Sequence, residues 1–399
     1  MMEIYTNCDA LVGDELELVR DVTIAVDRGK IAGIEEGRRD AGVDLAGGLV
    51  MPAFINAHTH IGDTAAKELG IGLPVEAAVK PPDGLKHRLL QAMSREELYR
   101  SIRQGLKEMM RSGVAAFGDF REGGLDGIRV LREASRDLPI RPVILGRPMA
   151  DSKSGFKVTQ RELEIIAAEA DGFGISSIDA FTPVVFRAIR KIAGDKVFAI
   201  HISESPREAA MSVEKYGATE VRRAFEFEPD LMVHLTHATD EDIEELKIRR
   251  QPIVCCPRTN LLLGDGIPPL HKFYESGIPV AFGSDNMMFS SPDMFREIDM
   301  ASRATRGATR EPSSITAEYA LRAATISGAK ALKLDAELGS LKPGKAATFL
   351  VLDRGKDWCA FSRNELSSIV HRAGPADIRW YVYAGEPVIE DGVFLYENI

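Results

Sequence analysis

The run VMPAFINAHTH, residues 50–60, decides the fold class of this chain. It is apolar and strand-like until it ends in two histidines, and seven similar runs follow it, most of them separated by helical stretches. The eight strand candidates are Val50–His60, Val114–Phe120, Arg141–Gly146, Gly172–Ser177, Val197–Ile202, Leu231–His237, Pro252–Cys256 and Pro279–Ser284. Alternating strands and helices indicate βα units and a parallel sheet. Eight such units predict a (β/α)8 barrel of the triosephosphate-isomerase type.

Helix-start signals lie between these runs. Ser94 with Glu97 forms a capping box, and the helix that it opens should stop at Gly113. Thr159 repeats the signature, and Thr239 is placed to cap the helix after the sixth strand.

Both ends of the chain have a different, β-rich texture, with strand-like runs at 22–26, 31–34, 347–352 and 379–384. Neither end has enough strands for a sheet of its own. We therefore expect residues 1–50 and 336–399 to form one small β-sandwich domain, with the barrel of residues 51–335 inserted between them.

The connection between the first strand and the first long helix, residues 61–93, is rich in glycine and proline. Connections of this length are usually functional or mobile. Two interpretations are equally open: a lid over the barrel mouth, or an ordinary excursion that packs on its neighbours.

Composition limits the function classes. The chain has 399 residues with 45% hydrophobic and 28% charged residues, which is ordinary for a globular protein. Its formal net charge of −10 argues against nucleic acid as the main partner. It has no apolar stretch of membrane-spanning length and no secretory signal pattern, so we expect a cytoplasmic protein that acts on a small molecule, with homo-oligomer formation left open. The cysteines Cys8, Cys255, Cys256 and Cys359 form no C-x-x-C pair, which predicts reduced thiols, with Cys255 and Cys256 packed in the interior.

Four predicted strands end in residues that carry chemistry. The first ends in His58 and His60, the fifth runs into His201 and Glu204, the sixth ends in His237, and the eighth ends in Asp285. Active sites of such barrels lie at this edge. Core packing explains no such gathering of imidazoles and carboxylates, although each residue alone has an ordinary structural explanation.

The residue types indicate a metal-dependent hydrolase. His58 and His60 point the same way because side chains alternate along a strand. With His201 and Asp285 they can surround one divalent ion, with zinc as the first choice and iron as the alternative, and leave a position for water. The ion lowers the pKa of that water and makes hydroxide available. Glu204 is then the general acid/base, and His237 stabilises the attacking oxygen or the developing charge.

The remaining histidines receive no role. His234 lies three residues before His237, so alternation places the two on opposite faces and predicts core packing for His234. His271 is expected on a helix and His371 in the C-terminal region, and His87 could reach the site from a lid.

These motifs resemble the amidohydrolase superfamily. MPAFINAHTH at 51–60, HISE at 201–204, VHLTH at 233–237, FGSDN at 282–286 and GSLKPGK at 339–345 resemble its ordered elements, and CPRTNLLLG at 256–264 resembles a segment of its cytosine deaminase, S-adenosylhomocysteine/methylthioadenosine deaminase and chlorohydrolase branch. The resemblance implies one metal on His58, His60, His201 and Asp285, with Asp285 also helping to deprotonate the water. The fourth strand lacks the lysine or glutamate that bridges two metals in other members.

The implied reaction is hydrolytic deamination of an amino-substituted nitrogen heterocycle. Hydrolysis of a cyclic amide or a C–Cl bond on such a ring is the alternative, and a non-catalytic scaffold is a further one. Arg121, Glu122, Arg147 and Arg258 follow strands at the catalytic rim and are the candidates for substrate binding. Each could equally form a salt bridge with a neighbour, and Glu122 is the obvious partner for Arg121.

Overall fold

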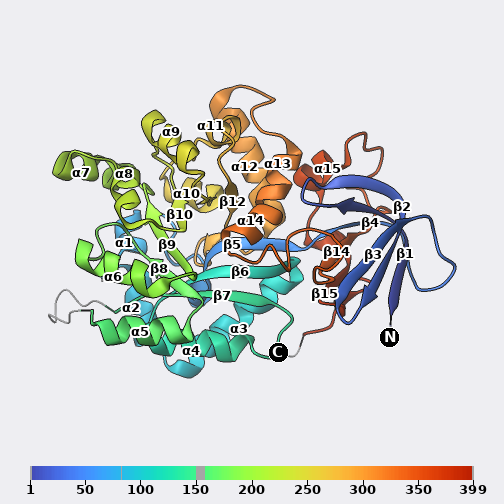
Figure 1. The fold of residues 1–399 in the computed structure, drawn as a ribbon, viewed down its shortest axis with the longest axis horizontal. Coiled ribbons are helices and arrows are strands. Elements are labelled where there is room, and N and C mark those ends of the chain that lie inside the picture. Colours follow the sequence, from blue (N-terminus) through green and yellow to red (C-terminus); the bar gives the residue numbers. More distant parts are fainter. Residues whose placement is uncertain (1, 82, 150–157, 398–399) are drawn as a thin grey trace.

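The computed structural model describes residues 2–81, 83–149 and 158–397. Its centre is a barrel of parallel strands enclosed by helices, and a separate sheet built from both ends of the chain lies beside it (Figure 1). The predicted (β/α)8 barrel with an additional β unit from both termini is confirmed.

The barrel strands follow one another in chain order, and every pair is parallel. They are β5 (Phe54–His60), β6 (Val114–Arg121), β7 (Arg141–Gly146), β8 (Gly172–Ile175), β9 (Val197–Ile202), β10 (Leu231–His234), β11 (Ile253–Cys255), β12 (Val280–Phe282) and β13 (Asp285–Asn286). The short strands β12 and β13 belong to one run of chain: β12 pairs with β11, whereas β13 pairs with β5. This interrupted eighth strand closes the ring.

The terminal strands form a second sheet in the order β17-β16-β15-β14-β4-β1-β2-β3. They are β1 (Glu3–Val12), β2 (Glu17–Asp27), β3 (Lys30–Glu36), β4 (Val43–Pro52), β14 (Phe349–Leu352), β15 (Ile378–Tyr383), β16 (Glu386–Glu390) and β17 (Val393–Phe394). The strand predicted over 50–60 is therefore divided. Residues 50–52 end β4, which pairs with β14, and the chain enters the barrel after Ala53.

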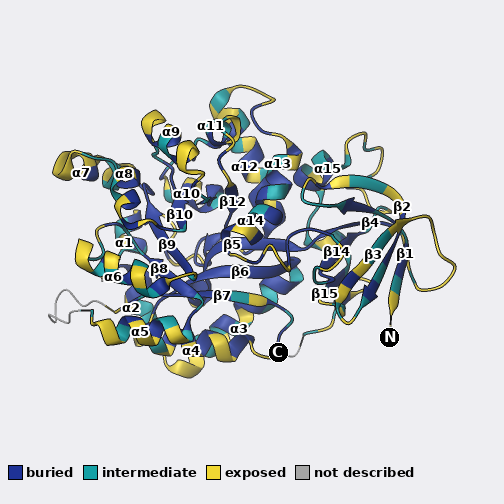
Figure 2. Cartoon of the chain, in the orientation of Figure 1, coloured by how far each residue is buried: buried dark blue, intermediate teal, exposed yellow. Residues whose placement is uncertain are grey.

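Amphipathic helices surround the barrel and the strands themselves are buried (Figure 2). The helices of the described residues outside the 61–93 segment are α3 (Arg95–Arg111), α4 (Gly124–Ser135), α5 (Gln160–Glu169), α6 (Pro183–Ala193), α7 (Pro206–Tyr216), α8 (Glu220–Ala224), α9 (Asp240–Arg249), α10 (Pro257–Leu263), α11 (Leu270–Glu275), α12 (Met294–Thr309), α13 (Ala317–Ala323), α14 (Ile326–Ala331) and α15 (Glu365–Arg372), with 3-10 turns η2 (Phe225–Phe227) and η3 (Pro375–Asp377). The predicted caps Ser94, Thr159 and Thr239 open α3, α5 and α9. None of the described helices is long and apolar enough to cross a membrane.

The segment 61–93 contains η1 (Ile61–Ala66), α1 (Val75–Ala78) and α2 (Leu85–Ala92). We call it the cap segment, because Val79, Lys80, Pro81 and Lys86 line the cavity at the barrel mouth. Ion pairs attach it to the barrel, among them the contact of 3.1 Å between Lys80 Nζ and Glu204 Oε2. Within the segment, a hydrogen bond of 3.0 Å joins His87 Nε2 to the Val79 carbonyl.

Candidate active site

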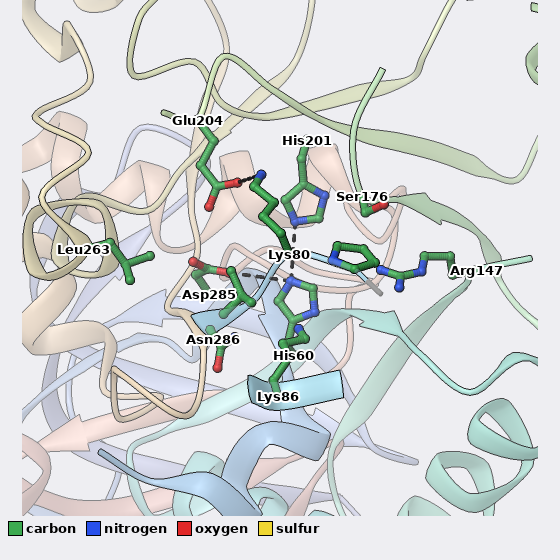
Figure 3. A pocket seen from close by; sticks show the side chains of 12 residues that line it. His60, Lys80, Lys86, Arg147, Ser176, His201, Glu204, Leu263, Asp285 and Asn286 are labelled. Atoms are coloured by element: carbon green, nitrogen blue, oxygen red, sulfur yellow. Dashed lines mark hydrogen bonds and ion pairs between the residues drawn. The ribbon is translucent and has the colours of Figure 1, made fainter. Parts of the chain in front are cut away.

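The predicted metal ligands converge at the barrel mouth, where Figure 3 shows His60, His201 and Asp285. Asp285 Oδ1 lies 3.0 Å from His58 Nε2 and 3.6 Å from His60 Nε2, and His60 Nε2 lies 3.4 Å from His201 Nε2. His58 and His60 end β5, His201 belongs to β9 and Asp285 begins β13. All four residues are buried. Side chains that are far apart in the sequence thus form one compact cluster.

Hydrogen bonds on the outer side of two imidazoles show why this cluster suits a cation. His201 Nδ1 is 2.8 Å from the Ile175 carbonyl, and His60 Nδ1 is 2.9 Å from Glu122 Oε1. Since these oxygens accept, both Nδ1 atoms donate, and in the neutral rings both Nε2 atoms carry lone pairs. Two lone pairs that face each other at 3.4 Å repel unless a positive charge lies near them. His58 Nδ1 is, in addition, buried without a hydrogen-bond partner among the described residues.

Burial favours the neutral form of two ligand imidazoles: it lowers the pKa of His58 to about 4 and holds the pKa of His201 well below its usual value. At His60, burial also lowers the pKa, but the neighbouring carboxylates of Glu122 and Asp285 outweigh it, so the net pKa is raised in the absence of a metal. For Asp285, burial raises the pKa, but the hydrogen bond from His58 and nearby imidazoles outweigh it, so the net pKa is lowered. Neutral imidazoles and an ionised carboxylate are the states that a divalent metal requires of its ligands.

Local sequence explains how Asp285 reaches the first strand. A Cβ atom on Gly283 would lie 2.7 Å from the backbone nitrogen of His58, so only glycine permits this approach. Asn56 then clamps Ser284: its Nδ2 donates to Ser284 Oγ at 2.7 Å, and its Oδ1 accepts from Ser284 N at 2.9 Å. The Gly-Ser-Asp run therefore places its carboxylate directly against the end of β5.

Glu204 lies on the other side of the cavity from His60. Its Oε2 is 3.1 Å from Lys80 Nζ of the cap segment (Figure 3). The same ammonium is 2.6 Å from Glu208 Oε1. Burial raises the pKa of Glu204. The charges of Lys80 and, to a smaller extent, His234 lower it by more than burial raises it, so the net pKa is below its ordinary value. Glu204 is thus a carboxylate at neutral pH and can accept a proton.

The interpretation of His234 as a core residue is wrong. Its Nε2 is 3.7 Å from Glu204 Oε1, and its ring lies within ligand distance of Asp285 and His58. The alternation argument fails because the backbone leaves the extended region at His234 (φ 80°) and Leu235 (φ 52°). His237, which was expected at the site, is half-buried and its Nε2 contacts the Asp265 carbonyl at 2.7 Å.

The four candidates for substrate binding have different surroundings in the structure. Arg147 lines the cavity, and no ion pair of its guanidinium occurs among the described residues. Arg121 is almost fully buried, and its Nη2 is 2.9 Å from Glu122 Oε2, as the sequence suggested. Glu122 contacts His60 on the outer side of the cluster. Arg258 points away, with Nη1 3.0 Å from the Ser291 carbonyl.

Several residues of the site were not predicted. Lys80, Lys86, Ser176, Leu263 and Asn286 all line the cavity. The lysines had a sequence signal as cations in a long loop that follows a catalytic strand. Leu263 and Asn286 lie within the motifs 256–264 and 282–286 that carry the family resemblance. The cavity itself is about 30 Å³, which is room for about two water molecules. A heterocyclic substrate therefore requires the cap segment, or Lys80 at least, to move.

This chain is similar to known proteins along most of its length. The model of the amidohydrolase family matches residues 49–388. A putative aminohydrolase of Methanothermobacter thermautotrophicus is 36% identical over 315 residues, which cover 77% of this chain and 82% of that protein. A 5-methylthioadenosine/S-adenosylhomocysteine deaminase of Acetivibrio thermocellus is 27% identical over 92% of this chain and 85% of its own.

Among solved structures, an adenosine deaminase from Xanthomonas campestris with bound zinc superposes with a TM-score of 0.85 at 22% identity, covering 99% of this chain and 94% of that chain. At this identity the superposition shows the shared fold.

Proposed function

The chain belongs to the amidohydrolase family, and we propose that it catalyses the hydrolytic deamination of an amino-substituted nitrogen heterocycle with one divalent metal ion. The observation that carries this proposal is the convergence of His58, His60, His201 and Asp285 beside the carboxylate of Glu204. The deaminase relatives favour this reaction over the other hydrolytic reactions of such sites.

His58, His60, His201 and Asp285 would hold the metal. Neutral imidazoles with a carboxylate suit zinc first and ferrous iron second. When bound, the ion would supply Lewis-acid chemistry, by which a water molecule is activated at neutral pH. Strand β8 (Gly172–Ile175) carries neither lysine nor glutamate, and this supports a single ion.

Glu204 would move the protons. Its carboxylate state suits it to take one proton from the attacking water and to deliver it to the ring nitrogen. The second proton of that water then passes to the amino group, the bond between the ring carbon and the amino nitrogen breaks, and ammonia leaves. Asp285, which has a lowered pKa, is a second acceptor beside the same water. Both carboxyl groups have lowered pKa values and are ionised at neutral pH, so each accepts a proton before it can donate one.

His234 would take the part that the sequence assigned to His237. Asn260 Nδ2 lies 3.2 Å from His234 Nδ1 and can donate to it. In a neutral ring with that bond, Nε2 carries the proton and points toward Glu204, with no hydrogen-bond acceptor of its own among the described residues. A buried N–H without an acceptor suits the oxygen that gains charge when water adds to the ring carbon.

Arg147 would bind the part of the substrate that does not react. Its guanidinium faces the cavity, as does Ser176. A planar cation of this kind suits a carboxylate, a phosphate or a carbonyl-rich ring. The proposed substrate is therefore an aminated heterocycle that carries such a group.

The test is ammonia release from metal-loaded enzyme across a panel of aminated purines, pyrimidines and pterins. Glu204→Gln should retain the metal and lose activity by at least about 100-fold, the usual range for general acid–base catalysis. Glu208→Gln is the matched control, because it contacts the same Lys80 but lies outside the metal cluster. It should stay close to wild type. Full activity of Glu204→Gln would remove Glu204 from the mechanism. Hydrolysis of a panel member without release of ammonia would favour the cyclic amide reaction.

A further inference from the structure

A network of buried charges lies on the outer side of His60, away from the cavity centre. Lys86 Nζ is 2.9 Å from Asp63 Oδ2 and 2.7 Å from Glu122 Oε1. Arg121 completes the network, with Nη2 2.9 Å from Glu122 Oε2 and Nη1 3.4 Å from Asp119 Oδ2. All five side chains are buried. Buried charges are costly unless each is paired with good geometry, so the members of the network depend on one another.

The network touches the candidate metal ligands at one atom. Glu122 Oε1, which is 2.7 Å from Lys86 Nζ, is also the acceptor for His60 Nδ1 at 2.9 Å. A carboxylate behind a ligand histidine fixes both the orientation of the ring and the nitrogen that is left free for the metal. The position of the Glu122 carboxylate thus decides how His60 presents its Nε2.

The two cations that hold Glu122 come from different parts of the chain. Arg121 is its neighbour on β6, so the barrel itself supplies that contact. Lys86 belongs to α2 of the cap segment, and it also separates Glu122 from Asp63. The carboxylate oxygens of Asp63 and Glu122 lie within 4.8 Å of each other and of His60. Without Lys86 these two carboxylates would repel each other directly.

We propose that Lys86 is a positioning residue for the metal site: it holds Glu122 against His60 and thereby ties the geometry of the metal ligands to the seating of the cap segment. The inference rests on the proposed metal-dependent function. It explains why the two lysines of the cap segment that line the cavity have different surroundings. Lys80 is partly exposed above Glu204, whereas Lys86 is buried behind His60.

The experiment compares metal binding, and uses activity only as a secondary readout. Apo-protein is titrated with Zn²⁺ against a chromogenic chelator, and the visible spectrum of the Co²⁺-loaded protein reports ligand geometry. Lys86→Met should weaken metal affinity by about 10- to 100-fold, the range for loss of an outer partner of a metal ligand, and should change the cobalt spectrum. The double variant Lys86→Met/Asp63→Asn removes the facing carboxylate together with the cation, and should recover most of the affinity.

Arg354→Met is the matched control. Arg354 is likewise a cation between two carboxylates, Asp9 and Glu365, but it lies in the terminal β sheet region, away from the metal cluster. It should lower thermal stability without changing metal affinity or the cobalt spectrum. If Lys86→Met does not fold, Lys86→Gln carries the same comparison and should show a several-fold loss.

The inference would be overturned if the Lys86 variant had the same metal affinity and the same cobalt spectrum as the wild type. The proposed function would still stand in that case, provided that the wild-type enzyme is active. A wild-type protein that binds the metal but releases no ammonia from any substrate would contradict the proposed function alone.

Discussion

Glu220 is a buried acid whose ionisation should cost the folded protein stability. It lies at the start of α8, and its Oε2 accepts a hydrogen bond of 2.6 Å from the backbone nitrogen of Ser203, the residue before Glu204. Burial, with the nearby charge of Glu208, raises the pKa of Glu220 from 4.5 to about 7. The folded protein therefore holds this proton more tightly than the unfolded chain does.

The sign and size of the effect follow from linkage. Below pH 4.5 the group is protonated in both states and makes no pH-dependent difference. As pH rises toward 7, the unfolded chain ionises first, so stability is lost until about pH 7 and stays constant above it. A shift from 4.5 to about 7 corresponds to about 3 kcal/mol.

The perturbation is Glu220→Gln, which keeps an oxygen for Ser203 N but cannot ionise. Relative to wild type, it should gain about 3 kcal/mol in the free energy of unfolding between pH 4 and pH 8. Urea unfolding should be followed by circular dichroism at 222 nm, because the only tryptophans, Trp358 and Trp380, lie outside the barrel. Ammonia release should persist, since the Ser203 contact is retained.

Glu220→Leu is the comparison that separates charge from hydrogen bonding. It leaves the Ser203 N–H without its acceptor, which costs about 1–3 kcal/mol at every pH. It should also reduce activity, because the turn that presents Glu204 loses its support. A stability difference between wild type and Glu220→Gln that is the same at pH 4 and pH 8 would refute the reasoning.

Two further predictions concern the cavity. His234→Ala should lower kcat by about 100-fold or more, the usual result of losing a donor to a developing charge, whereas His237→Ala should leave kcat close to wild type; the reverse order would restore the assignment made from sequence. Lys80→Met should move the acidic limb of the kcat/KM profile to higher pH, because Lys80 lowers the pKa of Glu204; Glu208→Gln serves as the control, and an unchanged limb would show that Lys80 does not set the protonation of Glu204.

The barrel and its candidate ligands could be predicted because they depend on local patterns. Apolar runs at regular intervals indicate parallel strands, and the catalytic edge of a barrel is fixed by strand direction. His58, His60, His201 and Asp285 therefore share one rim as soon as the strands are assigned. The structure brings His58, His60 and Asp285 within ligand distance of one another, and His201 within ligand distance of His58 and His60.

The cap segment could not be predicted in the same way. Whether residues 61–93 cover the site depends on contacts with partners that lie far away in the sequence. The ion pair of Lys86 spans from α2 to Glu122, and that of Lys80 reaches Glu204, 124 residues away. Periodicity and capping signals describe neighbours along the chain and carry no information about such pairs.

The error at His234 has a physical cause that also explains how the rim is built. Ser203, His234, Leu235 and Asp285 all have positive φ, between 51° and 80°. Residues other than glycine rarely adopt a positive φ, so surrounding contacts must maintain this backbone conformation. One is the hydrogen bond of 3.0 Å from Leu235 N to the Ile202 carbonyl, and another is the Glu220 contact to Ser203. At each of these residues the two-residue alternation of extended backbone is interrupted. At His234 the backbone leaves the extended conformation, and the alternation of side chains stops there. The same change of conformation directs the His234 imidazole into the site, beside Glu204.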